Sequence, residues 1–99
     1  ILENYEIDSI VIVAAGVAGV CKAVQEMKME DRITIVSFDA VPITREMLKQ
    51  GVIKATICQQ PFTQGYKSIE LAYNYFVIGK KSEKDKYIVK NEIKILENL

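Results

Sequence analysis

The sequence predicts an α/β fold, with a three-layer open parallel sheet and flanking helices. Three short apolar runs, at residues 9–14, 33–38 and 55–58, alternate with three segments in which apolar residues recur every three or four positions. Strands that alternate with helices favour right-handed crossovers, which make the strands parallel. Three such strands leave sheet edges and helix faces uncovered. We therefore expect the chain to be part of a larger fold or to pair with a second copy as a homodimer.

The first strand and the first helix are predicted from a change of period. Residues 9–14 are mainly apolar and β-branched, as expected of a strand that helices bury on both faces. After Gly16 the apolar residues follow a helical spacing and form one face, which consists of Val17, Val20, Cys21, Val24 and Met27.

The second strand and helix follow at once. Residues 33–38 form the second apolar run, and Asp39 ends it. Pro42 and Thr44 then begin a short helix, for which Gly51 is the expected stop.

The third strand is predicted at residues 55–58, and a longer helix follows it. Pro61 can occupy the first turn of this helix, where its missing N–H costs nothing. Helical spacing of apolar residues continues to about Gly79, where we expect the helix to end.

The C-terminal part changes character. Residues 80–86 carry charges of alternating sign, which is typical of a solvated loop. Residues 87–89 and 93–96 are then predicted as one or two terminal strands, with residues 91–92 as the break between them.

Composition excludes several classes of function. The chain has 99 residues, enough for one domain at most, and its 13 basic and 13 acidic residues give no net charge to attract nucleic acid. The longest apolar stretch, residues 10–20, is shorter than the roughly 20 residues that span a membrane. Histidine is absent, which removes the usual zinc sites and histidine-dependent nucleophiles. We therefore predict no catalytic residues, no metal, no cofactor and no membrane partner.

Two cysteines, Cys21 and Cys58, stand far apart and in no metal-binding spacing. Unpaired cysteines are among the residues most often buried, so both are predicted to act as small core residues. Free thiols also favour a reducing compartment, which indicates a cytoplasmic location.

Polar side chains follow two of the predicted strands. Asp39 ends the second strand and Gln59 follows the third. Ligands of open α/β sheets bind outside the carboxyl ends of the strands, so these residues predict a binding cleft for a small polar ligand. Two alternatives remain open, because Asp39 could serve as a turn or helix-cap residue and Gln59 could satisfy a backbone group where the Pro61 helix begins.

A dinucleotide site is a second interpretation. Residues 14–19 match G-x-G-x-x-G except that Ala14 replaces the first glycine, and Asp39 follows Gly19 by 20 residues, the spacing of the ribose-binding acid. This interpretation would make the chain the dinucleotide-binding domain of an oxidoreductase. Against it, a Cβ at Ala14 is a cost in the tight turn that the first glycine makes.

Two longer motifs favour another family. Val36-Ser37-Phe38-Asp39-Ala40 and the run from Lys54-Ala55-Thr56-Ile57-Cys58-Gln59-Gln60-Pro61 to Gly65 resemble the C-terminal part of the type I periplasmic-binding-protein fold. The resemblance extends from about residue 7 to residue 99. The family includes sugar receptors of ABC transporters and the effector domains of lac-repressor-like (LacI/GalR) transcription regulators.

The resemblance implies roles for particular residues. Asp39 matches the strand-end aspartate that accepts hydrogen bonds from sugar hydroxyls, and Gln59 matches the hinge glutamine. Phe38 would form an apolar wall beside them. Many members have Asn-Asp after the first strand, whereas this chain has Ala15 and Gly16 there. Either the ligand has fewer hydroxyl groups at this place, or backbone N–H groups at the helix start bind it instead.

The resemblance also implies a division into lobes and a mode of action. Residues 7–55 would belong to the C-terminal lobe, residues 56–79 would form the hinge crossing and a helix of the N-terminal lobe, and residues 86–99 would return as terminal strands. We expect a non-catalytic effector-binding domain of a LacI-family regulator, in which a sugar closes the lobes and DNA is bound only through a headpiece absent from this chain. The alternative is the substrate-binding protein of a sugar ABC transporter.

Overall fold

The computed structural model describes residues 1–99, and the chain forms two units. Unit 1 consists of Ile1–Cys58 and Glu92–Leu99, and unit 2 consists of Gln59–Asn91. None of the helices combines the length and the apolar composition needed to cross a lipid bilayer.

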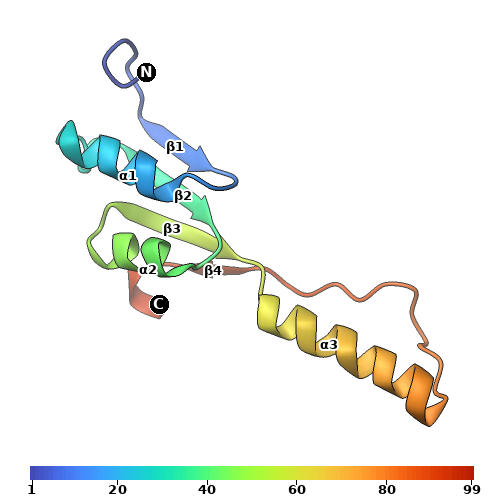
Figure 1. Ribbon diagram of the computed structural model, residues 1–99. Coiled ribbons are helices and arrows are strands. Elements are labelled where there is room, and N and C mark those ends of the chain that lie inside the picture. The colour runs from blue at the N-terminus through green and yellow to red at the C-terminus, as the bar shows by residue number, and fades with distance from the viewer. The chain divides into compact units, whose positions relative to one another are not determined.

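Unit 1 is built on a four-stranded sheet in the order β1-β2-β3-β4 (Figure 1). The strands are β1 (Ser9–Ile12), β2 (Thr34–Phe38), β3 (Ile53–Cys58) and β4 (Glu92–Lys94). The first three are parallel, and β4 adds to β3 in the antiparallel direction. The predicted α/β class with an open, mainly parallel sheet is confirmed.

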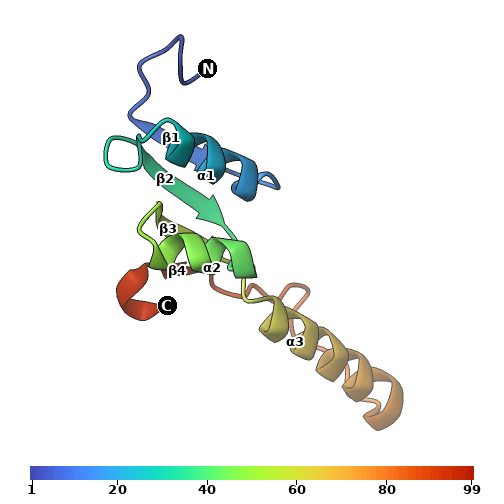
Figure 2. The ribbon, with the colours of Figure 1, turned by 60° about the vertical axis from the view of Figure 1, so that its left-hand side comes forward.

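Two helices cover one face of this sheet, α1 (Val17–Glu26) and α2 (Pro42–Lys49), and the views in Figures 1 and 2 agree on this. The parallel strands β1, β2 and β3 advance in one direction across the sheet. Because such crossovers are almost always right-handed, both crossover helices are expected on the same face. The hydrophobic core between helices and sheet is aliphatic apart from two sulfur-containing residues, and Ser37, Thr44 and Thr56 are also fully buried. Its buried members are Ile12, Val17, Cys21, Val24, Ile33, Ile35, Met47, Leu48, Val52 and Ile53.

The other face of the sheet, here called the open face, is formed by two rows of paired residues. One row is Val11, Val36 and Ala55, and the other is Phe38, Ile57 and Ile93. Val11 is 60% exposed and Ile93 is 62% exposed. The prediction that the first strand is buried on both faces is therefore wrong for this chain, because both helices of unit 1 pack on the opposite face. Of the three predicted layers, the sheet and one helical layer are present in unit 1.

Both helices of unit 1 end in the same backbone motif. After α2 the N–H of Gly51 donates to the Leu48 carbonyl (3.1 Å) and that of Val52 donates to Met47 (3.0 Å), and Gly51 has φ 78°. This is the paired hydrogen-bond pattern of a Schellman C-cap, which satisfies the last carbonyls of a helix. The predicted stop at Gly51 is confirmed.

Unit 2 contains α3 (Pro61–Tyr73), which runs into a π-helical turn at Asn74–Ile78 and ends at Gly79. Gly79 has φ 77°, a conformation that glycine adopts without strain, so the predicted helix end is confirmed. None of the residues of α3 is buried. Large side chains are exposed along the helix and its π turn, namely Phe62, Tyr66, Ile69, Tyr73 and Phe76.

The C-terminal predictions need correction. Residues 87–89 form no strand, because they find no neighbouring strand with which to pair. The last strand is β4 at Glu92–Lys94, so Glu92 begins a strand that it was predicted to break. Leu96 lies in a 3-10 helix, Leu96–Asn98, instead of the strand predicted at residues 93–96.

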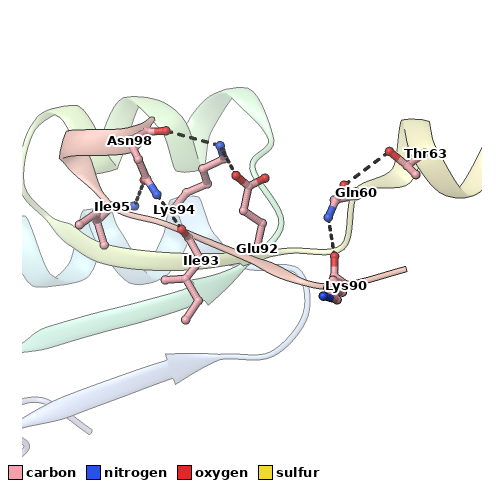
Figure 3. Close-up of polar contacts among 8 residues, drawn as sticks. All are labelled: Gln60, Thr63, Lys90, Glu92, Ile93, Lys94, Ile95 and Asn98. Carbon is pink, nitrogen blue, oxygen red and sulfur yellow. Dashed lines mark hydrogen bonds and ion pairs between the residues drawn. The ribbon is translucent and has the colours of Figure 1, made fainter. Parts of the chain in front are cut away.

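Side-chain contacts explain why β4 stops where it does. The Asn98 Oδ1 atom accepts a hydrogen bond from the Ile95 N–H (2.7 Å), and its Nδ2 donates to the Ile93 carbonyl (3.0 Å), as Figure 3 shows. The Lys94 ammonium lies 2.9 Å from Glu92 Oε1. The amide of Asn98 thus occupies backbone groups that a longer strand would need, and the chain turns.

Candidate ligand-binding edge of the sheet

The predicted site residues of unit 1 lie at one edge of the sheet. Ala15 and Gly16 follow β1, Phe38 is the last residue of β2, and Asp39 comes directly after it. Because β1 and β2 are parallel neighbours, their carboxyl ends lie side by side. Ala15, Gly16 and Asp39 are exposed at this edge, whereas Phe38 is half-buried in the open face.

The first residue of unit 2 is Gln59, which follows the last residue of β3 without an intervening loop. It is also exposed. Its carbonyl accepts a hydrogen bond of 2.5 Å from the side-chain amide of Gln64 in the first turn of α3. The backbone of Gln59 is therefore tied to the start of α3 by a side chain of that helix.

The Asp39 backbone is held on both sides by β3. Its φ is 69°, in the left-handed region that few residues other than glycine adopt. The Asp39 N–H donates to the Ile57 carbonyl (2.8 Å), and the Asp39 carbonyl accepts a hydrogen bond of 2.6 Å from the Thr56 Oγ1 hydroxyl. The position at which the Asp39 side chain leaves the sheet is thus fixed by its neighbouring strand.

The Thr56 hydroxyl also accepts a hydrogen bond from a second buried side chain. Ser37 Oγ lies 3.0 Å from Thr56 Oγ1, and both residues are completely buried under the helices. Thr56 has only one hydroxyl proton, which it donates to Asp39, so Ser37 is the donor in this pair. Such a chain of hydrogen bonds, with each hydroxyl satisfied, costs little to bury.

The alternative roles of Asp39 can now be separated. Helix α2 has Val41 as its N-cap residue, so Asp39 is not at the cap position. It does lie in a bend of the chain with positive φ, which aspartate is among the few residues to tolerate. The turn role and a ligand-binding role are compatible, because the first uses the backbone and the second uses the carboxylate.

The start of α1 bears on the dinucleotide interpretation. Gly16 is the N-cap residue with φ 104°, whereas Ala14 has an ordinary negative φ. The turn is therefore made by Gly16, and the expected cost at Ala14 does not arise. A Cβ added at Gly19 would have no atom within 4 Å, so this glycine does not provide the close helix–strand packing for which the fingerprint needs it.

The sequence did not point to two residues of this region, Thr56 and Gln60. Gln60 has φ 54° and is the N-cap residue of α3. Its Nε2 donates to the Lys90 carbonyl (2.5 Å) and its Oε1 lies 3.5 Å from Thr63 Oγ1, which ties the helix start to the returning chain within unit 2 (Figure 3). A signal existed for each: Thr56 is a hydroxyl within an apolar strand, and Gln60 precedes a proline.

Both cysteines are buried and unpaired, as predicted. Burial raises the pKa of the Cys21 thiol. Burial is also the main cause that raises the pKa of Cys58, at the end of β3, with the Lys94 ammonium acting in the opposite direction. At neutral pH both thiols are therefore protonated and behave as apolar groups.

The chain matches a known family over most of its length. Residues 1–81 match the family model described as the periplasmic binding protein domain. No match is found among curated protein sequences.

Solved structures share the fold. A glucose-galactose binding protein from Geobacillus stearothermophilus, GanP, superposes with a TM-score of 0.85 at 23% identity, over 99% of this chain and 35% of that one. A carbohydrate transporter solute binding protein from Agrobacterium radiobacter, in complex with D-arabinose, gives 0.81 at 26% identity, over 98% and 32%. A protein from Bacteroides fragilis described as a LacI transcriptional regulator gives 0.83 at 20% identity, over 98% and 33%.

This chain thus spans about a third of the length of the structures it matches. The match at these identities concerns the fold, and the fold agrees with the parallel sheet and its crossover helices. The chain belongs to the periplasmic binding protein domain family.

Proposed function

We propose that this chain is part of a protein that binds a small sugar, and that Asp39 accepts hydrogen bonds from the sugar hydroxyls. The observation that carries the proposal is the placement of Asp39, an exposed carboxylate on a rigidly held turn at the carboxyl edge of a parallel sheet. The structures bound to D-arabinose or named for glucose and galactose have the same fold, which supports a sugar as the ligand class.

Three further features would contribute to the same function. The N–H groups of the first turn of α1 directly follow Gly16. Because Gly16 has no side chain to cover them, these N–H groups could donate hydrogen bonds to a ligand oxygen. Gln59 would donate and accept hydrogen bonds with a hydroxyl group. Phe38 would supply apolar surface for a sugar ring. The lobe assignment, with residues 7–55, 56–79 and 86–99 as its parts, belongs to the same proposal, as does the absence of catalysis.

The test is sugar binding by the full-length protein. A thermal-shift screen would include D-arabinose, D-glucose, D-galactose, nucleosides and dinucleotides, and calorimetry would measure the affinity for any sugar that stabilises the protein. Replacing Asp39 with Ala should weaken that affinity by about 1.5–3 kcal/mol, the range for hydrogen bonds to a charged group. Asp39→Asn keeps both the tolerance of positive φ and an acceptor oxygen, so its loss should be smaller.

Asp31 provides a matched control. It is an exposed aspartate in the turn before β2, at the opposite end of that strand. Asp31→Ala should leave the sugar affinity unchanged. Equal affinities for the wild-type protein and Asp39→Ala would exclude Asp39 from the site, and stabilisation by a dinucleotide alone would favour the oxidoreductase interpretation.

Two biological roles are compatible with sugar binding. The likeness to the Bacteroides fragilis protein and the two unpaired thiols favour a cytoplasmic LacI-family regulator, in which lobe closure is coupled to DNA affinity in a headpiece. The likeness to solute binding proteins favours a transporter receptor. Sugar-dependent binding of the full-length protein to DNA would support the regulator, and delivery of the sugar to a permease would support the receptor.

A further inference from the structure

Asp39 is one of three non-glycine residues with positive φ in the chain. An L-residue in the left-handed conformation costs about 1–2 kcal/mol relative to the right-handed one, and such a conformation persists only where neighbouring groups enforce it. The group enforcing it therefore also sets the direction in which the Asp39 carboxylate leaves the backbone.

Two contacts to β3 enforce the conformation, and they differ in kind. The Asp39 N–H bonds to the Ile57 carbonyl, which is a backbone contact that any residue at position 57 would supply. The Asp39 carbonyl is bonded by the Thr56 hydroxyl at 2.6 Å, which depends on the side chain of Thr56 alone. Of the two, only the second is specified by a side chain.

The Thr56 hydroxyl has no freedom to turn elsewhere. Thr56 is fully buried, its χ1 is restricted by β-branching, and its lone pair receives the proton of the equally buried Ser37. Its single proton is therefore directed at the Asp39 carbonyl.

We propose that Thr56 is a positioning residue for the ligand: it orients the Asp39 carboxylate by fixing the Asp39 backbone from inside the sheet, without touching the ligand. This inference rests on the proposed sugar-binding function. It extends the site from the exposed edge into the buried face beneath α2.

The experiment compares three single variants in the full-length protein, with D-arabinose, D-glucose and D-galactose as probes. Thr56→Val keeps the shape and removes the donor, and should weaken the binding of the sugar that the wild-type protein prefers by about tenfold, the equivalent of one lost hydrogen bond. Thr56→Ser keeps the hydroxyl and should bind within about twofold of wild type. Rescue by serine separates the hydroxyl from the methyl group.

Thr44→Val is the matched control. Thr44 is as completely buried as Thr56, but its Oγ1 has no hydrogen-bond partner. The same chemical change at Thr44 should leave the affinity unchanged. Equal losses of sugar affinity in Thr44→Val and Thr56→Val would mean that the effect is a general consequence of changing a buried threonine. That result would overturn the inference.

A double-mutant cycle with Asp39→Ala gives the decisive readout. If Thr56 acts through Asp39, adding Thr56→Val to Asp39→Ala should change the affinity by less than about twofold. A tenfold loss in that background too would overturn the inference while leaving the proposed function intact. If Asp39→Ala binds like wild type, or no probe binds the wild-type protein, the proposed function fails first and the inference fails with it.

Discussion

Thr44 and Thr56 are both fully buried, but their hydroxyl groups differ in hydrogen bonding. Thr56 Oγ1 both accepts and donates a hydrogen bond, whereas Thr44 Oγ1 is buried without a partner. A buried hydroxyl that lost its water without gaining a partner destabilises the folded state. The two residues therefore predict stability changes of opposite sign for one substitution.

Thr44→Val should raise the free energy of unfolding by about 1 kcal/mol, because it removes the unsatisfied hydroxyl and keeps the shape of the side chain. Thr56→Val should lower it by about 1–3 kcal/mol, because the Asp39 carbonyl and Ser37 hydroxyl then lose their partner. Urea denaturation measures both changes, with the dependence of the free energy of unfolding on urea concentration fitted to one common value for all variants. A lower stability for Thr44→Val would show that its hydroxyl is bonded after all.

The cysteines predict how stability depends on pH. Burial raises the pKa of both thiols, so the folded chain holds these protons at a pH where the unfolded chain has released them. The unfolded chain then binds fewer protons, and by linkage the free energy of unfolding falls as pH rises beyond the ordinary thiol range. Below that range the thiols make no pH-dependent contribution.

Urea denaturation between about pH 8 and about pH 10.5 should show this decline. The double variant Cys21→Ala/Cys58→Ala is less stable overall, but its stability should fall less steeply over the same interval. Parallel declines for the two proteins would assign the effect to groups other than the thiols.

At the scale of elements, two Schellman C-caps differ in one residue. The cap of α2 places Gly51 at the left-handed position, and the cap of α1 places Lys28 there with φ 54°. The hydrogen bonds are the same in both, from Lys28 to Gln25 (3.0 Å) and from Met29 to Val24 (3.0 Å) in α1. The two caps differ only in the residue at the left-handed position, which is a conformation that glycine adopts without strain and lysine does not.

Lys28→Gly should therefore stabilise the protein by up to about 1 kcal/mol, and Gly51→Ala should destabilise it by about 1 kcal/mol. No atom lies within 4 Å of a Cβ placed at Gly51, so its loss would come from the backbone and not from a clash. Thermal or urea denaturation measures both changes. Destabilisation by Lys28→Gly would show that the lysine side chain contributes more than its backbone costs.

The existence and order of the elements could be predicted because they depend on local patterns, such as the helical spacing after Gly16 and the proline at the start of α3. The ends of strands depend on partners instead. Strand β3 begins at Ile53 and not at Ala55 because Ile53 pairs with Ile35 across a bulge. Residues 87–89 have the composition of a strand but no neighbour, and composition alone could not reveal that.

The same limit applies to the candidate site. Asp39 and Gln59 could be proposed as ligand residues because each is a polar residue directly after a short apolar run, and they remain proposals. The contact of Thr56 with Asp39 joins residues 17 positions apart, and it exists only because of the register between β2 and β3. Sequence pattern does not specify that register to the single residue.

At the scale of the whole molecule, the open face and the exposed side of α3 present large apolar surfaces. Val11, Val13 and Ile93 are each at least 60% exposed. Large exposed apolar patches lead protein chains to associate in water, because association buries the patches. We therefore expect the 99-residue chain to self-associate when it is expressed by itself.

Sedimentation velocity at increasing concentration tests this. The double variant Val11→Lys/Ile93→Lys should shift the distribution toward the monomer. Ile88→Lys is the control, because Ile88 is equally apolar and 89% exposed but lies outside the sheet. A wild-type chain that stays monomeric at every concentration would contradict the expectation, and an equal effect of Ile88→Lys would place the association elsewhere.

The pairing of Cys58 with Glu92 has a consequence for protein engineering. These two residues are the last partners of the antiparallel strands β3 and β4, so all of Gln59–Asn91 is, in topological terms, the loop of a β-hairpin. A two-residue Asn-Gly turn is the preferred connection for such a pair of strands. A chain in which Asn-Gly replaces Gln59–Asn91 would keep every strand, both covering helices and the Thr56–Asp39 contact, and would present the candidate ligand-binding edge as a minidomain small enough for residue-by-residue assignment by NMR.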